Sequence, residues 1–452
     1  MNSASDAPLA EGRDFGLSAE PLPGDRVRFG ATVSIISLVS AFFAVILSGL
    51  SLAPTGLLLV FCGALTALYV LREAKLSSAA FLVLSFLGYC LFSGIFFSGI
   101  DSVFSVGVVH WLSNEGRIFL AYWPAILILV YGRFVGAESD RIVIRALKYT
   151  TVVYVLGATV ARFSGVLGDY SHHAGGAVGA SLFIIWFLLY QSDKEKMYLI
   201  MLAAASVGLV ASDSRTGILG SALVLILMGM SLKNIKQLAL GVIIFISMLF
   251  VMNAFYPKVY DRLSGAITAS TMQAMGQQLG RVFQDRSFEE TSDAWGVASY
   301  VPDQGEVNLV IRAYLWARGL SEGGGSPIHG IGFGRFNDIG RTFEGVRGVS
   351  YAVYKADRAS GSVFTAHNTF VHIFAELGLI GVAFVAAIFV TLHRAYSSCS
   401  EKAGLKWARI GKAMCLSLAV MGMFQHSLGA PIFLFTMFTM AAWCYCRVRM
   451  YS

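Results

Sequence analysis

The sequence has little charge for its length. Only 13% of its 452 residues are charged, whereas 56% are hydrophobic. A soluble globular protein usually has about a quarter of its residues charged. The apolar residues also fall in long blocks, which are typical of membrane-spanning helices. The scarcity of charge therefore argues against a soluble enzyme and predicts an all-α polytopic membrane protein.

Signals for secretion, disulfides and nucleic acid are also missing. Residues 1–26 lack the apolar run and cleavage site of a signal peptide, so we expect a disordered cytoplasmic tail. The six cysteines show no disulfide or zinc spacing. The net charge of +7 does not predict nucleic acid binding, because the basic residues gather between apolar blocks.

Twelve apolar blocks are present, each long enough to cross the hydrocarbon core of about 30 Å. The predicted spans are Val27–Leu50, Ala53–Leu71, Ser78–Phe97, Phe119–Phe134, Val143–Ala161, Gly175–Tyr190, Met197–Ala211, Thr216–Leu232, Leu238–Phe255, Asn368–Leu392, Ile410–Phe424 and Pro431–Cys446. This layout divides the chain into nine spans in residues 27–255, one large loop in 256–367, three spans in 368–446 and a short tail in 447–452.

The basic residues between the spans predict the orientation. Alternate short segments, beginning with the N-terminal side, hold most of the arginines and lysines, namely Arg72, Lys75, Arg133, Arg141, Arg145, Lys148, Lys194, Lys196, Lys233, Lys236, Arg394, Lys402, Lys406, Arg409, Lys412, Arg447 and Arg449. The opposite short segments hold only Arg117, Arg162 and Arg215. Basic segments stay in the cytoplasm. We therefore expect both termini in the cytoplasm and the large loop on the outer face of the membrane.

The large outer loop contains one segment with helical periodicity. The loop is close to neutral, with eleven basic and eleven acidic residues. Within it, Val307–Leu320 alternates apolar and polar residues at helical spacing and is followed by Gly323–Gly325. This pattern predicts an amphipathic helix, which we expect to lie on the membrane surface.

Candidate chemical residues lie on the outer side. Arg215 follows Ser214 in a short turn, and an arginine beside a helix N-terminus makes an anion site. A topological anchor or a salt bridge to Asp213 is the alternative role for Arg215. His367 stands at the start of a predicted span, where an imidazole tends to stay neutral and can act as a general base. A simple helix-capping histidine is the alternative there.

Three further patterns are weaker. Arg312 lies on the amphipathic helix, where its spacing to Gly323 has no evident mechanism. His372 and Glu376 are four residues apart, so we interpret them as a structural pair within the membrane. The glycines of Gly330–Gly334 are spaced as in a phosphate-binding loop, but no strand precedes them. No carboxylate pair suggests a metal site on the outer side.

At these residues the sequence resembles the O-antigen ligase and Wzy-type polymerase family. The H-N-x9-G-x2-G pattern is complete at His367, Asn368, Gly378 and Gly381, and R-x10-G matches at Arg312 and Gly323. The turns at Ser214–Gly217 and at Arg162 resemble the arginine segments of that family. The resemblance extends over about residues 150–392.

The resemblance implies an inner-membrane glycosyltransferase with GT-C-like architecture. It would take a glycan from an undecaprenyl diphosphate carrier on the periplasmic face, with inversion and without metal or other cofactor. His367 would be catalytic, Arg215 and Arg312 would bind the diphosphate, and Arg162 and Asn368 would be further candidates for substrate binding.

The acceptor separates two members of this class. A polymerase of O-antigen or exopolysaccharide repeat units is the first prediction, and a ligase acting on lipid A–core in lipopolysaccharide biosynthesis is the alternative. Membrane lipid and other polysaccharide assembly proteins are the remaining expected partners. A transporter or flippase of lipid-linked sugars is a second alternative, although the sequence shows no internal repeat and few polar residues within the spans.

Overall fold

A computed structural model describes most of the helical part of the chain. The described residues are 24–48, 76–96, 117–132, 137–164, 174–212, 214–231, 304–336, 366–423 and 434–451, together with residues 239, 243, 246, 247 and 250. Regular structure within these ranges is entirely helical. The all-helical class predicted from the sequence is confirmed for this part of the protein.

The predicted spans that fall within the described ranges coincide with helices, because long apolar stretches can satisfy their backbone groups in lipid only as helices. The helices are α1 (Gly24–Ser48), α3 (Ser78–Phe96), α6 (Arg117–Tyr131), α7 (Ala137–Ser164), α8 (Ala174–Asp193), α9 (Lys196–Ala211), α10 (Arg215–Ser231), α17 (Thr369–Ser398), α18 (Lys402–Gly422) and α19 (Thr439–Arg449), which a short π-helix, η4 (Leu434–Phe438), precedes. The predicted span Ala53–Leu71 lies outside the described residues, and Leu238–Phe255 is described at only five positions.

Membrane-spanning helices are confirmed, but their number is not. Among the described residues, four helical stretches are long and apolar enough to cross a membrane, namely Ser78–Phe96, Glu138–Val160, Gly176–Asp193 and Thr369–Ser398. Shorter apolar helices accompany them at Gly30–Phe42, Tyr122–Tyr131, Lys196–Ala211 and Thr216–Gly229. The count of twelve spans, the GT-C-like architecture and the boundaries of the loop and tails therefore stay predictions.

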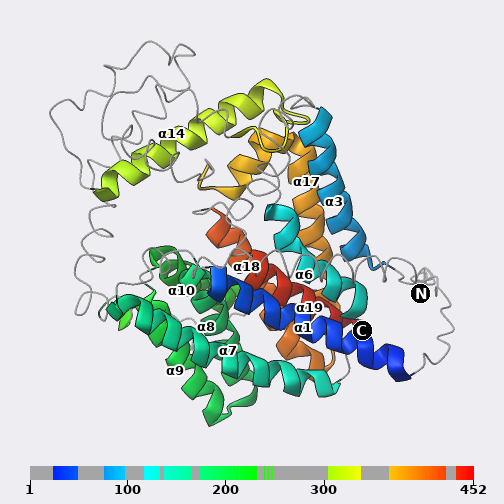
Figure 1. The fold of residues 1–452 in the computed structure, drawn as a ribbon, viewed down its shortest axis with the longest axis vertical. Helices are drawn as coiled ribbons and strands as arrows, with labels where there is room; N and C mark the ends of the chain where they lie inside the picture. The colour runs from blue at the N-terminus through cyan, green and yellow to red at the C-terminus, as the bar shows by residue number, and fades with distance from the viewer. Residues whose placement is uncertain are drawn as a thin grey trace, which may run out of the picture.

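Helix α8 lies at the centre of the bundle (Figure 1). Every residue from Gly176 to Leu189 is buried, and α8 contacts α1, α7, α9, α10, α18 and η4. Its polar groups are paired within the protein. The indole of Trp186 donates to Thr151 Oγ1 at 2.8 Å, and the Ser181 hydroxyl donates to Thr436 Oγ1 at 3.1 Å. The peripheral helices α7 and α9 instead expose apolar side chains such as Leu156 and Ile200, as expected of lipid-facing surfaces.

Ion pairs tie together the end of the bundle that the charge pattern assigns to the cytoplasm, here called the inner end. Arg447 of α19 is fully buried and donates from Nε to Asp140 Oδ1 of α7 at 2.6 Å and from Nη2 to Oδ2 at 2.9 Å. Trp407 of α18 donates to the same carboxylate at 3.0 Å. A second pair joins Lys406 to Asp193 at 3.3 Å. These contacts join α7, α8, α18 and α19.

The opposite, outer end is covered by the helix predicted from the amphipathic segment. This helix, α14 (Gln304–Gly325), crosses above the other helices and packs against the first half of α17 (Figure 1). Figure 1 also shows α17 alongside α3. The prediction of a helix is confirmed. The packing adds that one face of α14 is applied to α17, so the helix is docked on protein along that face.

Candidate functional site at the outer end

His367 stands in an uncommon backbone conformation at the entry to α17. Its φ is +49°, a value that a residue with a side chain adopts only at a conformational cost. The next residue, Asn368, is the N-cap of α17, and its side chain accepts from the backbone N–H groups of Phe370 and Val371 at 3.0 and 3.1 Å. Backbone strain of this kind persists where the surroundings hold it, and it gathers at functional sites.

A contact from α14 holds the other side of His367. The indole N–H of Trp316 donates to the carbonyl of Ala366 at 2.6 Å. His367 therefore lies between a residue fixed by α14 and a residue fixed by the first turn of α17. The side chain of His367 is partly exposed, so it is held at the surface of the outer end.

The spacing between Arg312 and Gly323 now has a physical explanation. Eleven residues make about three turns of an α-helix, so both residues lie on one face, together with Trp316 and Gly319. That face meets α17: a side chain at Gly323 would overlap Phe374, and one at Gly319 would press on Val371. Gly319 and Gly323 let the C-terminal half of α14 approach α17 closely. Arg312 lies on the same face in the N-terminal half of α14.

Arg312 is thereby brought to the His367 end of α17. It is one turn before Trp316, whose indole is bonded to the residue preceding His367. The side chain of Arg312 is partly exposed. The structure thus packs the helix that carries Arg312 against the start of α17, next to His367, which lies 55 positions later in the sequence. The sequence prediction missed Trp316, although its position four residues after Arg312 was a signal.

A loop after α14 is built into a break in α17. Gly378 has φ +61° and interrupts the helix, which leaves backbone groups without helical partners. Ile331 and Gly332 donate to the carbonyls of Ala375 and Glu376, both at 2.9 Å. In return, Leu379 donates to the carbonyl of Pro327 at 2.8 Å, and Ile380 donates to that of Ile328 at 3.1 Å. Irregular backbone at membrane depth is tolerated when protein satisfies its polar groups in this way.

Glycine is required where the loop meets the break. A side chain at Gly378 would overlap the backbone of Ile328, and one at Gly330 would overlap the backbone of Glu376. Gly330, Gly332 and Gly334 all have positive φ. Their spacing therefore serves close backbone packing, which explains a phosphate-loop-like pattern without a preceding strand.

The His372 and Glu376 pair is structural, as predicted. His372 Nε2 lies 3.3 Å from Glu376 Oε2, and both side chains are buried. The other carboxylate oxygen of Glu376 accepts from the backbone N–H of Phe336 at 2.8 Å, and the Phe336 ring stacks on the imidazole at 4.6 Å. The pair anchors the loop to α17 next to the break.

The other predicted arginines are placed at the level of the backbone. Arg215 is the first residue of α10, where Ser214 Oγ accepts from Gly217 N at 3.2 Å and so caps the helix. The outer part of α18 lies between α10 and α17, since Met421 packs at Gly220 and Gly422 packs at Thr369. Arg215 therefore begins a helix at the same end as His367. Its side chain lies outside the described residues.

Arg162 is two residues before the end of α7, and its side chain is likewise not described. Helix α7 packs against α1, α8 and α9, and the contacts that hold the α14–α17 pair involve other helices. The part of the chain that the structure describes contains no group of three or more histidines, cysteines or acidic residues able to hold a metal. A role for Arg162 and a metal-independent mechanism both stay predictions.

Comparison with known families supplies the class of the protein. Residues 197–386 match the family model described as O-antigen ligase. This region belongs to the O-antigen ligase family. The match spans α9 to most of α17 and contains Arg215, Arg312, His367 and Asn368, whereas Arg162 precedes it. The chain gave no match among curated proteins. The predicted resemblance is confirmed, and an O-antigen ligase or polymerase type of activity on a lipopolysaccharide-related glycan follows from it.

Proposed function

We propose that this member of the O-antigen ligase family transfers a glycan from a polyprenyl diphosphate carrier to an acceptor hydroxyl at the outer membrane surface. One observation carries the proposal. The Trp316–Ala366 hydrogen bond and the glycine-lined contact hold α14, which carries Arg312, against the start of α17, next to His367, and so support a shared site. A cationic group and an imidazole are the two groups that such a transfer needs.

The leaving group determines the role of the arginines. When the bond between the anomeric carbon and the carrier oxygen breaks, negative charge develops on the diphosphate, and placed cations stabilise it. Guanidinium groups bind phosphate oxygens bidentately and stay charged at any physiological pH. Arg312 would supply this charge from α14, and Arg215 would supply it from the start of α10. No step then requires a metal ion.

His367 would act on the acceptor. The acceptor oxygen forms a bond to the anomeric carbon on the face opposite the departing diphosphate, so the configuration inverts. The acceptor proton passes to the imidazole, and the diphosphate leaves with the electron pair of the broken bond. The positive φ of His367 and the Asn368 cap define the backbone turn that carries this side chain. Asn368 would serve mainly by holding that turn.

Substitution of His367 tests this mechanism. His367→Ala at normal expression is expected to reduce transfer from a lipid-linked donor in isolated membranes by roughly 10²–10⁴-fold, the usual contribution of a general base. His393→Ala is a matched control, because His393 is an exposed histidine at the inner end of the same helix. EDTA should leave the wild-type rate unchanged. Full transfer by His367→Ala, or abolition of transfer by EDTA, would contradict the proposal.

The acceptor distinguishes the two candidate reactions. Polymerisation of repeat units is the prediction made from the sequence, and the description of the matched family favours the ligase as second candidate. Deletion of the gene followed by electrophoresis of the surface glycan separates them. Single-repeat products indicate a polymerase, whereas full-length chains retained on the carrier indicate a ligase. Uptake of lipid-linked sugar into vesicles without any change of linkage would instead favour a flippase.

A further inference from the structure

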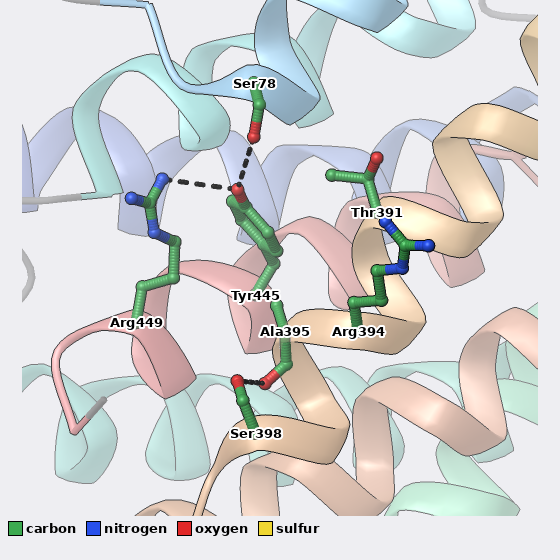
Figure 2. Close-up of a pocket in the computed structure, with 7 residues that line it drawn as sticks. All are labelled: Ser78, Thr391, Arg394, Ala395, Ser398, Tyr445 and Arg449. Carbon is green, nitrogen blue, oxygen red and sulfur yellow. Dashed lines mark hydrogen bonds between the residues drawn. The ribbon is translucent and has the colours of Figure 1, made fainter. Parts of the chain in front are cut away.

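A pocket at the inner end lies far along α17 from the outer site. Its volume is about 380 Å³, and it opens between α3, α17 and α19. The lining is mainly polar and basic, and it comprises Ser78, Thr391, Arg394, Ala395, Ser398, Tyr445 and Arg449. Figure 2 shows the two arginines on opposite sides of Tyr445. Three helices thus contribute polar and cationic groups to one opening.

The pocket is organised around the Tyr445 hydroxyl. This oxygen lies 3.4 Å from the Ser78 hydroxyl and accepts from Arg449 Nη1 at 3.3 Å (Figure 2). Tyr445 itself is buried, so Arg449 is tethered to a fixed group at the pocket wall. Arg394 approaches from α17, and Ser78 stands at the N-terminus of α3, where the helix dipole is positive.

Within the part of the chain that the structure describes, neither Arg394 nor Arg449 makes an ion pair with a carboxylate. Arg447, two residues before Arg449, is instead buried and paired with Asp140. The two arginines of the pocket are exposed. These two arginines of α19 therefore have different surroundings: Arg447 is buried in an ion pair, whereas Arg449 is exposed at the pocket.

Apolar side chains continue from the pocket toward the membrane interior. Phe81 lies one turn after Ser78 on α3 and is 60% exposed, and Val390 lies one turn before Arg394 on α17 and is 47% exposed. An amphipathic ligand could place its anionic group on the arginines and its chain across these residues. Basic pockets between membrane helices at the cytoplasmic side are suited to phosphate-bearing headgroups.

We propose that the pocket lined by Arg394 and Arg449 binds a phosphate group at the inner membrane surface, and that this phosphate belongs to an anionic phospholipid. The two guanidinium groups would bind the phosphate oxygens, with Ser78 and Thr391 as neutral donors. The apolar surface at Phe81 and Val390 favours a lipid over a soluble phosphate, because a soluble anion has no group to cover it. This site is separate from the transfer site and independent of the acceptor.

Native mass spectrometry of the full chain tests the proposal. The protein would be released from vesicles of phosphatidylethanolamine and phosphatidylglycerol, and the retained phosphatidylglycerol would be counted. Losing two charge-assisted hydrogen-bonding groups in Arg394→Gln/Arg449→Gln should weaken retention at least about tenfold. Arg141→Gln/Arg145→Gln is the matched control, because it removes two exposed arginines from α7 at the same end. Its retention should stay within about twofold of wild type.

The outcomes separate the sources of the phosphate. Loss of phosphatidylglycerol in the pocket variant alone supports the proposal. Equal loss in both double variants, or no loss in either, overturns it. A parallel melting experiment uses inorganic phosphate and no lipid. Stabilisation by phosphate that depends on Arg394 and Arg449, without lipid retention that depends on them, would assign the pocket to a soluble anion and overturn the lipid source.

Unchanged gel filtration and melting of the Arg394→Gln/Arg449→Gln variant in phosphatidylethanolamine exclude misfolding. Arg394→Lys should retain part of the binding, because it keeps the positive charge.

Discussion

The two ends of the helix bundle are stabilised by different chemistry. At the inner end, ionised side chains join the helices, with Arg447 and Asp140 at the centre. At the outer end, the backbone of the 326–332 loop forms hydrogen bonds with the backbone at the break in α17. Glycines permit this close contact. Both ends connect elements far apart in the sequence. The inner end uses its charge for packing, whereas the outer end obtains its shape largely from backbone hydrogen bonds.

This difference indicates how the outer end can carry chemistry. Hydrogen bonds between backbone groups of residues 326–332 and the break in α17 fix the loop against the first half of α17. Arg312 and His367 lie beside this framework and are partly exposed. A substitution in the inner ion pairs should therefore act mainly on stability, and a substitution in the outer framework should act on both stability and transfer.

The largest expected effect is that of Gly378→Ala. A side chain there meets a positive φ and overlaps the backbone of Ile328, so the four hydrogen bonds between loop and helix should be lost. Strain and lost bonds together amount to roughly 4 kcal/mol. Melting temperature and transfer rate should both fall. Gly88→Ala is the control, since no atom lies within 4 Å of the added carbon. If Gly378→Ala and Gly88→Ala had equal melting temperatures and transfer rates, the hydrogen bonds between the loop and α17 would not be needed for the outer end.

The next effect is that of Arg447→Ala, which should destabilise the protein by about 3 kcal/mol because it leaves the Asp140 carboxylate without its guanidinium. Thermal melting in detergent measures this, and the transfer rate per folded molecule should stay close to wild type. The double variant Asp140→Asn/Arg447→Gln removes both charges and keeps an oxygen for Trp407, so it should recover part of the loss. A strong loss of transfer by folded Arg447→Ala would show that the two ends are coupled.

The smallest effect, and the sharpest comparison, uses two neighbouring glycines. A methyl group at Gly323 would contact Phe374 and push α14 away from α17, whereas Gly324 has nothing within 4 Å. Gly323→Ala is expected to cost about 1–3 kcal/mol in the packing of α14 and to lower transfer about tenfold by displacing Arg312. Gly324→Ala should match wild type in the same membrane assay. If both variants were equally active, α14 would not position Arg312.

Much of the fold could be predicted because its signals are local. The length of an apolar block and its flanking residues define a membrane helix, and the ends of α9 and α10 agree with the predicted spans within one residue. The pairing of His372 with Glu376 also follows from a short spacing. The family motif around His367 contains enough fixed positions to be recognised without a structure.

The rest could not be predicted because it depends on contacts between distant segments. Nothing near Gly330 shows that it will pack against the backbone of Glu376, and the phosphate-loop-like spacing suggested a different role. The R-x10-G spacing acquires its meaning only when α14 lies on α17 and Trp316 reaches Ala366, 50 residues later. The inner pocket likewise needs three helices to meet.

The sequence by itself determined the all-helical membrane class and the family, since these depend on hydropathy and on a motif of closely spaced residues. It also predicted the orientation, through the placement of arginine and lysine. Only the tertiary structure decided that α14 packs against the start of α17, why α17 breaks at Gly378, and that Arg447 is buried while Arg449 lines a pocket. The physical reason is that side-chain pattern along a helix defines a face, but packing alone decides what that face contacts.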